Sequence, residues 1–293
     1  MKRTYQIGGA LLVLSLAAVF AIPAHAVPGD ALRVVTVPVP SPTGIGVSFA
    51  ADCEGNLYYT NFQSPYLHKM TALGALIGTV SLADAAGDSL TLGEMAWDDK
   101  RKVLWAGTDS QSPIKIYQID PVTGICTYKF DGGPGISLTD GLAYEDAADG
   151  DPANDMIYHS PDVSCDVYVF QAISGALVRT ITPLNAAGSA MCGISGLTVG
   201  IGSQLYVGHN GFGEIFRVDK FTGAFLGGFS TPGGRDEGLE CDAMNFLPKL
   251  ALWSKDAYND QITAIEVEPR TCNCGGVVPT VPSTWGSMKA RYR

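Results

Sequence analysis

The chain repeats a pair of short apolar segments five times, and each pair opens on a polar or glycine residue. The copies begin near Gly46, Gly93, Asp140, Ser195 and Glu237, at spacings of 47, 47, 55 and 42 residues. In each copy an apolar stretch leads through a short polar turn to a second stretch rich in Leu, Tyr and Trp. This pattern predicts an antiparallel hairpin, and a period of this length is typical of β-propeller blades.

Each repeat continues with an alternating segment and a glycine-containing turn, as at 120–124 and 219–223, which predicts four strands per blade. The fifth repeat has a third strand at 261–267 but no fourth. The apolar segment 31–39 precedes the first repeat and has no partner there. We therefore predict an all-β fold, a five-bladed β-propeller whose ring is closed by the N-terminal strand completing the last blade, because closure removes an exposed sheet edge.

The N-terminus has the pattern of a secretory signal peptide. Lys2 and Arg3 precede an apolar stretch from Ile7 to Ile22, and the small residues at 24–26 form a cleavage site. The apolar run is short for a membrane span, which needs about 20 residues. We predict a signal peptide at 1–26, the propeller at 27–274, and a linker with a short basic C-terminal tail at 275–293. The protein is expected to be exported to the periplasm, the cell surface or the medium, with no membrane span after signal cleavage.

Charge and cysteine content refine this expectation. The formal net charge of −10 becomes −12 once Lys2 and Arg3 are removed, which argues against a nucleic acid as partner. All seven cysteines follow residue 26, where an oxidising compartment permits disulfides, and an odd number leaves at least one unpaired or intermolecular. Cys272 and Cys274 lack a matching His or Cys pair, so a structural disulfide is favoured over a zinc site. The disulfide pattern is left open.

Several motifs resemble known propellers. The turns Asp120–Gly124 and Asp219–Gly223 and the polar-Gly-Leu strand openings resemble those of YVTN-type, NHL-type and gluconolactonase-like propellers. The segment Asp236–Asp242, with Ala251–Lys255, also resembles phytase-esterase-like and plant-type glutaminyl cyclotransferase propellers. The resemblance covers residues 31–269 and implies the propeller fold. Its motifs are structural, so it assigns no specific family.

The first strand of every propeller blade lines the central channel, so its opening residues and the end of the second strand ring one mouth. The candidate ligand-binding residues in these two columns are Asn61, Glu94, Asp140, Ser195, His209, Asn210, Glu237 and Lys255. Asp109, His159, Asp162 and Asp256 fall on the same rim. The alternative is that these side chains are solvated strand ends or partners for backbone groups.

The gluconolactonase-like resemblance implies a divalent cation at this mouth. Glu94, Asp140 and Glu237 would be its ligands, with Asn61 and Asn210 beside them, and Ca²⁺ or another hard cation suits such oxygen donors.

Two catalytic hypotheses follow from the same rim. In the first, the metal polarises a carbonyl or phosphoryl oxygen while His159 or His209 transfers a proton. In the second, Asp140 and Glu237 divide into an acid and a base, since neighbouring carboxyls separate their pKa values.

Two function classes therefore remain. The favoured one is an exported binding or interaction platform for a protein or small-molecule ligand, because the sequence has no complete catalytic signature. The alternative is a metal-dependent hydrolase, lactonase or cyclotransferase that uses the same rim.

Two segments lie outside the repeat pattern. The insertion at 145–155 is dense in oxygen donors but lacks the EF-hand spacing, so a solvated acidic loop is favoured over a calcium site. The segment 284–293 begins with Thr-Trp-Gly and carries three basic residues. It resembles short C-terminal tails of exported bacterial proteins, which implies sorting or partner docking.

Overall fold

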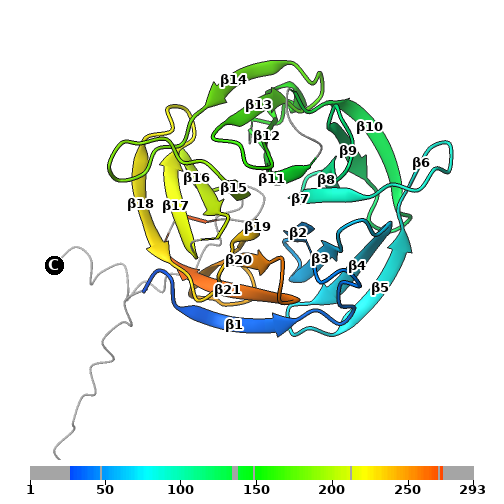
Figure 1. The fold of residues 1–293 in the computed structure, drawn as a ribbon, viewed down its shortest axis with the longest axis horizontal. Helices are drawn as coiled ribbons and strands as arrows, with labels where there is room; N and C mark the ends of the chain where they lie inside the picture. The colour runs from blue at the N-terminus through cyan, green and yellow to red at the C-terminus, as the bar shows by residue number, and fades with distance from the viewer. Residues whose placement is uncertain are drawn as a thin grey trace, which may run out of the picture.

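Five small sheets, antiparallel apart from one short added strand, are arranged around a central axis (Figure 1). This computed structural model describes residues 27–46, 48–133, 138–147, 149–211, 213–269 and 271–272. The predicted signal peptide and C-terminal tail lie outside these residues. Over the ranges described, no helix has the length and apolar character to cross a membrane. The all-β, five-bladed β-propeller predicted from the repeat is confirmed.

Four blades are built from consecutive strands. The first contains β2 (Ser48–Ala51), β3 (Asn56–Thr60), β4 (Tyr66–Thr71) and β5 (Leu76–Ser81). The second contains β7 (Leu92–Asp98), β8 (Val103–Thr108), β9 (Lys115–Ile119) and β10 (Ile125–Asp131), with the short β6 (Ala83–Asp84) added in parallel. The third contains β11 (Thr139–Glu145), β12 (Met156–Pro161), β13 (Val167–Gln171) and β14 (Leu177–Ile181). The fourth contains β15 (Ile194–Val199), β16 (Gln204–His209), β17 (Glu214–Asp219) and β18 (Phe225–Ser230).

The fifth blade joins the two ends of the ring. It contains β19 (Glu237–Asp242), β20 (Leu250–Asp256), β21 (Gln261–Val267) and the N-terminal strand β1 (Ala31–Thr36). β1 pairs antiparallel with β21, with Val35 opposite Ile262, and Figure 1 shows it in blue along the outside of β21. The predicted closure by the N-terminal strand is confirmed, although the strand ends at Thr36 rather than at residue 39.

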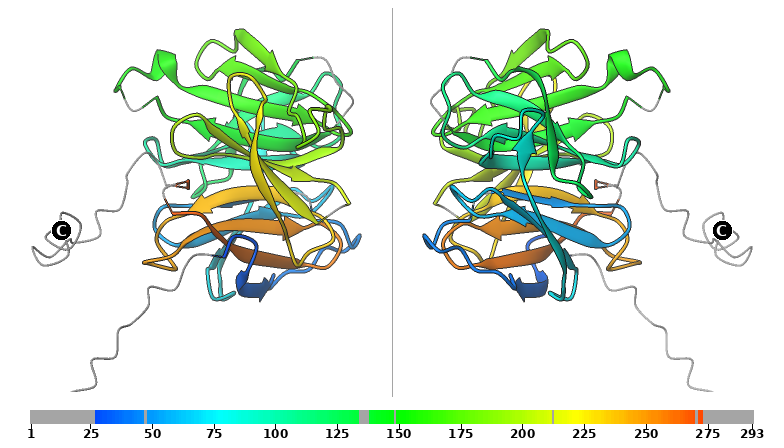
Figure 2. Two further views of the ribbon diagram at one scale, coloured as in Figure 1. Left: turned by 90° about the vertical axis from the view of Figure 1, so that its left-hand side faces the viewer. Right: turned by 90° about the vertical axis from the view of Figure 1, so that its right-hand side faces the viewer.

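Glycines in the turns allow neighbouring blades to approach each other closely. The outer strands run across the side of the ring, as β18 does in yellow in Figure 2, and so reach the next blade. A Cβ atom at Gly124 (φ 76°) would lie 2.0 Å from the Ser81 carbonyl oxygen of the preceding blade. A Cβ at Gly223 (φ 74°) would lie 2.3 Å from the Thr182 carbonyl oxygen. Both the backbone conformation and the close contact require glycine here.

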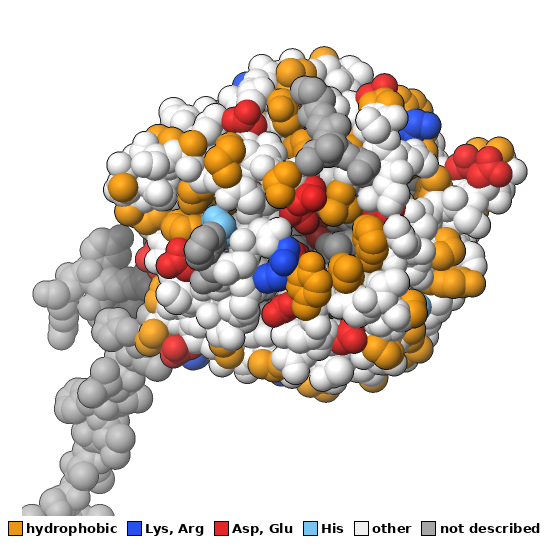
Figure 3. Space-filling view, viewed as in Figure 1, with side chains coloured by type: hydrophobic (Ala, Val, Ile, Leu, Met, Phe, Trp, Pro, Cys, Tyr) orange, Lys and Arg blue, Asp and Glu red, His pale blue; other side chains and the backbone are white. Residues whose placement is uncertain are grey.

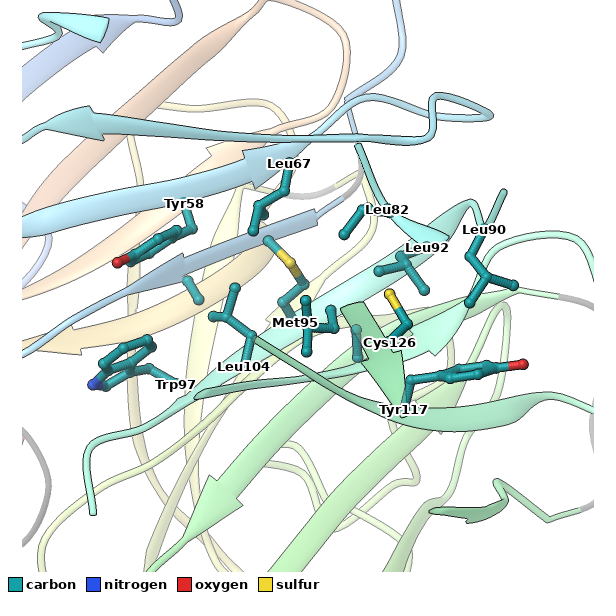
Figure 4. Close-up of a cluster of buried hydrophobic side chains, with 13 residues drawn as sticks. Tyr58, Leu67, Leu82, Leu90, Leu92, Met95, Trp97, Leu104, Tyr117 and Cys126 are labelled. Carbon is teal, nitrogen blue, oxygen red and sulfur yellow. The ribbon is translucent and has the colours of Figure 1, made fainter. Parts of the chain in front are cut away.

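Five clusters of buried apolar side chains form the core, one between each pair of neighbouring blades. Figure 4 shows the cluster between the first two blades, where Leu67 of β4 and Tyr58 of β3 meet Met95 and Trp97 of β7 and Leu104 of β8. Burial of such side chains contributes about 1.5–3 kcal/mol each. Because the apolar contacts lie between blades, the ring as a whole holds each sheet in place.

A buried carboxylate ends the first strand of several blades and binds the aromatic residue of the second strand. Asp98 accepts a hydrogen bond from Trp105 Nε1 at 3.2 Å, and Asp242 accepts one from Trp253 Nε1 at 2.7 Å. Asp242 also accepts from the backbone N–H of Asn245 at 2.9 Å and so caps the turn. These pairs lie at the face opposite the strand openings and explain the recurring Trp and Tyr of the second strands.

The acidic insertion of the third blade has a structural role. It contains a short 3₁₀ turn, η1 (Pro152–Asn154). Asp155 is fully buried and accepts hydrogen bonds from Arg101 Nη2 at 2.7 Å and from the Tyr144 hydroxyl at 3.0 Å. Since Arg101 also binds Asp98 at 2.7 Å, the insertion fastens the third blade to the second.

Two disulfides join described residues, Cys165 to Cys192 and Cys241 to Cys272. Buried Cys126 carries a free thiol, as the odd number of cysteines required. The structural disulfide expected at Cys272 is present, and its partner, which the sequence left open, is Cys241 of β19. Cys274 lies outside the described residues.

Candidate ligand pocket at the channel mouth

A pocket of about 310 Å³ opens on the face where the first strands begin. Its apolar wall is formed by Ile45, Phe62, Leu138, Val163, Ala257 and Tyr258. Its polar wall is formed by Asp140, Asp162, Asn210, Arg235 and Glu237. Figure 3 looks onto this face and shows acidic, basic and hydrophobic side chains together around the central hollow. The volume falls at the lower end of the range for small-molecule sites.

The sequence-predicted rim is divided between the pocket and the channel beneath it. Asp140, Asn210 and Glu237, with Asp162, line the pocket. Asn61, Glu94, Ser195 and Lys255 are each at most 2 % exposed and are not part of its wall. Strand position in the sequence therefore does not indicate how deeply each of these side chains is buried in the channel.

Arg235 and Tyr258 were not predicted, and they shape the mouth. Arg235 Nε and Nη2 each lie 2.6 Å from Glu237 Oε1, and the guanidinium carbon lies 4.6 Å from the centroid of the Tyr258 ring. Both residues are in loops beyond the strand ends, so the strand alignment did not include them. The sequence signal for Arg235 was a basic residue directly before an acidic strand opening.

Asp140 and Glu237 form a pair of interacting carboxyl groups in the wall of this pocket. Burial, followed by the neighbouring carboxylates of Glu237 and Asp162, raises the pKa of Asp140 well above its usual range, and Arg235 opposes this. Burial also raises the pKa of Glu237, while its contact with Arg235 lowers it. Since Arg235 contacts Glu237 directly, a proton held by the pair favours Asp140. Asp140 Oδ2 and Glu237 Oε2 have no hydrogen-bond partner among the described residues.

Glu94 lies fully buried in the channel. Its Oε1 accepts a hydrogen bond from the Phe49 backbone N–H at 3.3 Å, and burial raises its pKa well above the usual range. Gly238 has a φ of 67°, and a Cβ there would lie 3.1 Å from Glu94 Oε2. The glycine of the Glu-Gly-Leu opening therefore leaves room for a carboxyl group from the second blade.

Lys255 and Asn61 hold the loops that enter the first blade. Lys255 is 0 % exposed and donates from Nζ to the Gly46 carbonyl oxygen at 2.9 Å. Burial lowers its pKa to about 8, and nearby acidic groups, Asp260 first, oppose the shift. Asn61 Nδ2 donates to the Val39 carbonyl oxygen at 3.3 Å. A backbone-supporting role therefore accounts for both side chains.

The two rim histidines lie outside the pocket wall. His159 is fully buried, with Nδ1 3.0 Å from the Gly132 carbonyl oxygen, and burial lowers its pKa to about 4. His209 is partly buried, with Nδ1 3.2 Å from the Asn210 carbonyl oxygen, and burial lowers its pKa as well. His159 is therefore neutral at pH 7, and the expectation that it titrates near neutral pH does not fit this environment.

Two acidic rim residues shape turns. Asp109 is 2 % exposed and accepts hydrogen bonds from the Gln63 backbone N–H and the Thr91 hydroxyl. Asp256 accepts from the Tyr258 backbone N–H at 2.9 Å. These contacts agree with the alternative in which rim residues serve backbone groups.

The expected cation ligands Glu94, Asp140 and Glu237 do not form a metal centre. Across the described ranges, no group of three or more His, Cys, Asp or Glu side chains is placed to hold a metal ion. Arg235 already supplies a positive charge to Glu237. The described residues therefore show no metal site at the mouth, and we assign no reaction step to a cation.

The lip of the pocket is strained and cross-linked. Val163 has a φ of 53° and is 60 % exposed, a conformation that β-branched residues rarely adopt. The Cys165–Cys192 disulfide follows two residues later and ties this turn to the segment before β15. Strained backbone of this kind gathers at ligand-binding sites.

No protein-family model and no curated protein matches the sequence. Among solved structures, the chain resembles a glutaminyl cyclase from Myxococcus xanthus, with 11 % identity, a TM-score of 0.58, and 82 % of this chain and 97 % of that chain covered.

Two further structures align over a similar span. A luciferin-regenerating enzyme has 12 % identity and a TM-score of 0.52, covering 84 % of this chain and 98 % of that chain. The calcium-binding protein regucalcin from Agrobacterium tumefaciens has 14 % identity and a TM-score of 0.52, covering 87 % and 100 %. At these identities the likeness shows a shared fold. The chain therefore has the five-bladed β-propeller fold in common with these structures' fold class, and no family is assigned to it.

Proposed function

We propose that this protein binds a small organic molecule in the pocket at the channel mouth. The observation that supports this most is the combination of an apolar wall with two buried carboxylate oxygens, Asp140 Oδ2 and Glu237 Oε2, that lack protein partners within the described residues. An unpaired buried polar group costs about 1–3 kcal/mol, and pockets that combine apolar walls with a few such groups are typical of ligand sites. A concave site of this size favours a small molecule over a protein partner.

We also propose that the protein acts outside the cytoplasm, with residues 1–26 as a removed signal, residues 27–274 as the propeller and residues 275–293 as a tail. The disulfides Cys165–Cys192 and Cys241–Cys272 support this, because disulfides are typical of oxidising compartments.

A fragment screen tests the binding proposal. We expect ligand-observed NMR to find small molecules that bind the protein, and Tyr258→Ala to weaken them about tenfold through loss of about 1.4 kcal/mol of ring contact. Tyr66→Ala is the matched control, because Tyr66 is 46 % exposed against 56 % for Tyr258 but does not line the pocket. The pocket is not the ligand site if every fragment binds Tyr258→Ala as tightly as Tyr66→Ala. The absence of any bound fragment would also refute the proposal.

A second candidate is catalysis by the Asp140 and Glu237 pair, as a hydrolase, lactonase or cyclotransferase. The raised pKa of Asp140 favours it, because a protonated Asp140 can donate to a leaving oxygen while ionised Glu237 accepts a proton. The glutaminyl cyclase and the luciferin-regenerating enzyme share the fold, which is compatible with this role.

The calcium expectation can be tested without a substrate. We expect added calcium to shift the melting temperature by less than about 1 °C, because a cation that does not bind the native state adds no stability. Differential scanning fluorimetry with calcium and with EDTA measures this. A clear calcium-dependent rise that Asp140→Asn abolishes would restore the metal-dependent alternative.

A further inference from the structure

We infer that the ligand of this pocket carries a positively charged amine attached to a small apolar group, an inference that rests on the proposed function. Three carboxyl groups, those of Asp140, Asp162 and Glu237, face one guanidinium in the pocket wall. Arg235 is already bound to Glu237 through two nitrogens. Even with one proton on the acidic pair, the pocket keeps a negative charge that a cationic ligand neutralises.

Two buried carboxylate oxygens of the residues that line the pocket are acceptors without a donor. Asp140 Oδ2 and Glu237 Oε2 have no partner in the described parts of the chain, and an ammonium group offers three donors. The nearby ammonium of Lys255 interacts electrostatically with Glu237, but its hydrogen bond goes to the Gly46 carbonyl oxygen and leaves both carboxylate oxygens without a donor. A carboxylate or phosphate ligand would instead face the pair with like charge.

The apolar residues that line the pocket suit an apolar group. Tyr258 and Val163 are 56 % and 60 % exposed at the pocket lip, and Phe62 lies in the same wall. The Val163 backbone is held in its left-handed conformation beside the Cys165–Cys192 disulfide. Tyr258 already contacts the Arg235 cation through its ring, an interaction that a ligand ammonium can also make.

Three probes of similar shape and different charge test this inference: 2-phenylethylamine, 2-phenylethanol and phenylacetate. By isothermal titration calorimetry at neutral pH, we expect the amine to bind at least tenfold more tightly than the alcohol and the carboxylate to bind more weakly still. Glu237→Gln should remove this preference for the amine. Asp162→Asn, at a partly exposed position, provides a second variant that should weaken the amine selectively.

Glu214→Gln is the matched control, because Glu214 is an exposed carboxylate outside the pocket and its replacement changes the net charge equally. If the alcohol or the carboxylate binds as tightly as the amine, the ligand class is wrong while small-molecule binding itself stands. Unchanged amine affinity in both pocket variants also overturns the inference, as does the absence of amine binding at millimolar concentration. Failure of the proposed function is recognised separately, by the absence of any fragment that depends on Tyr258.

Discussion

Replacing Val35 with aspartate should lower the free energy of unfolding by about 4 kcal/mol, because it places a charge in a closed apolar cluster. Val35 is 6 % exposed on β1 and belongs to the cluster that contains Phe49, Trp253 and Ile262. β1 closes the ring against β21. Loss of this contact opens the fifth blade and exposes the β21 edge to other chains. Chemical denaturation measures the stability, and size-exclusion chromatography detects association.

The adjacent position supplies the control. Val34 is 53 % exposed on the same strand and pairs with Thr263, so Val34→Asp should change the stability by no more than about 0.5 kcal/mol. The two variants have the same composition and the same charge. If Val35→Asp stays within about 1 kcal/mol of the original protein, β1 does not close the ring in solution.

The blade count was predictable because its signals are local. Turns such as Asp120–Gly124 set both the hairpin and the contact between blades through one glycine, Gly124. Closure followed from an unpartnered strand at one end and a missing strand at the other. These inferences need the order of the strands and no knowledge of side-chain depth.

The site was only partly predictable, because the burial of each side chain and the position of each loop depend on how the blades pack in the complete ring. Strand alignment put Asp140, Glu237 and Glu94 in one set, but only Asp140 and Glu237 line the pocket, and Glu94 does not. The sequence suggested His159 as a residue that transfers a proton, but its burial in the folded protein lowers its pKa to about 4. Arg235 reaches Glu237 from a loop whose path no local pattern records.

The disulfide between Cys241 and Cys272 also could not be predicted from local sequence patterns. They are 31 residues apart, and β20 and β21 lie between them in the chain. After β21 the chain passes back to β19, which brings Cys272 next to Cys241. The spacing of the cysteines in the sequence does not contain this information, so the disulfide pattern could not be predicted from it.

Glu240 gives the second large effect, because it is a carboxyl in the channel that sequence reasoning did not include. It accepts hydrogen bonds from the Trp97 backbone N–H at 3.2 Å and from Thr198 Oγ1 at 3.0 Å. These partners belong to β7 and β15, so Glu240 of β19 connects the first strands of three blades. Burial raises its pKa from an ordinary value of 4.5 to about 7.

A carboxyl whose pKa is raised by folding stabilises the protein while it is protonated. This contribution is fully present below the unfolded pKa of 4.5 and is lost as the pH rises through about 7. The shift corresponds to roughly 3 kcal/mol, which we reduce to roughly 2 kcal/mol because Glu240 is partly exposed within the channel.

The free energy of unfolding of Glu240→Gln should therefore rise relative to that of the original protein as the pH rises. At pH 4.5 the variant is expected to be about 1 kcal/mol less stable, since its amide NH₂ cannot accept from the Trp97 N–H. Between pH 4.5 and pH 8 the difference should move by roughly 2 kcal/mol in favour of the variant and change sign, because glutamine has no proton to lose. Urea denaturation of both proteins across this range measures the difference, and exposed Glu214→Gln should show no comparable trend. A difference that stays constant with pH would mean that Glu240 is ionised in the folded channel at all these pH values, held there by its three donors, Trp97, Thr198 and Cys241.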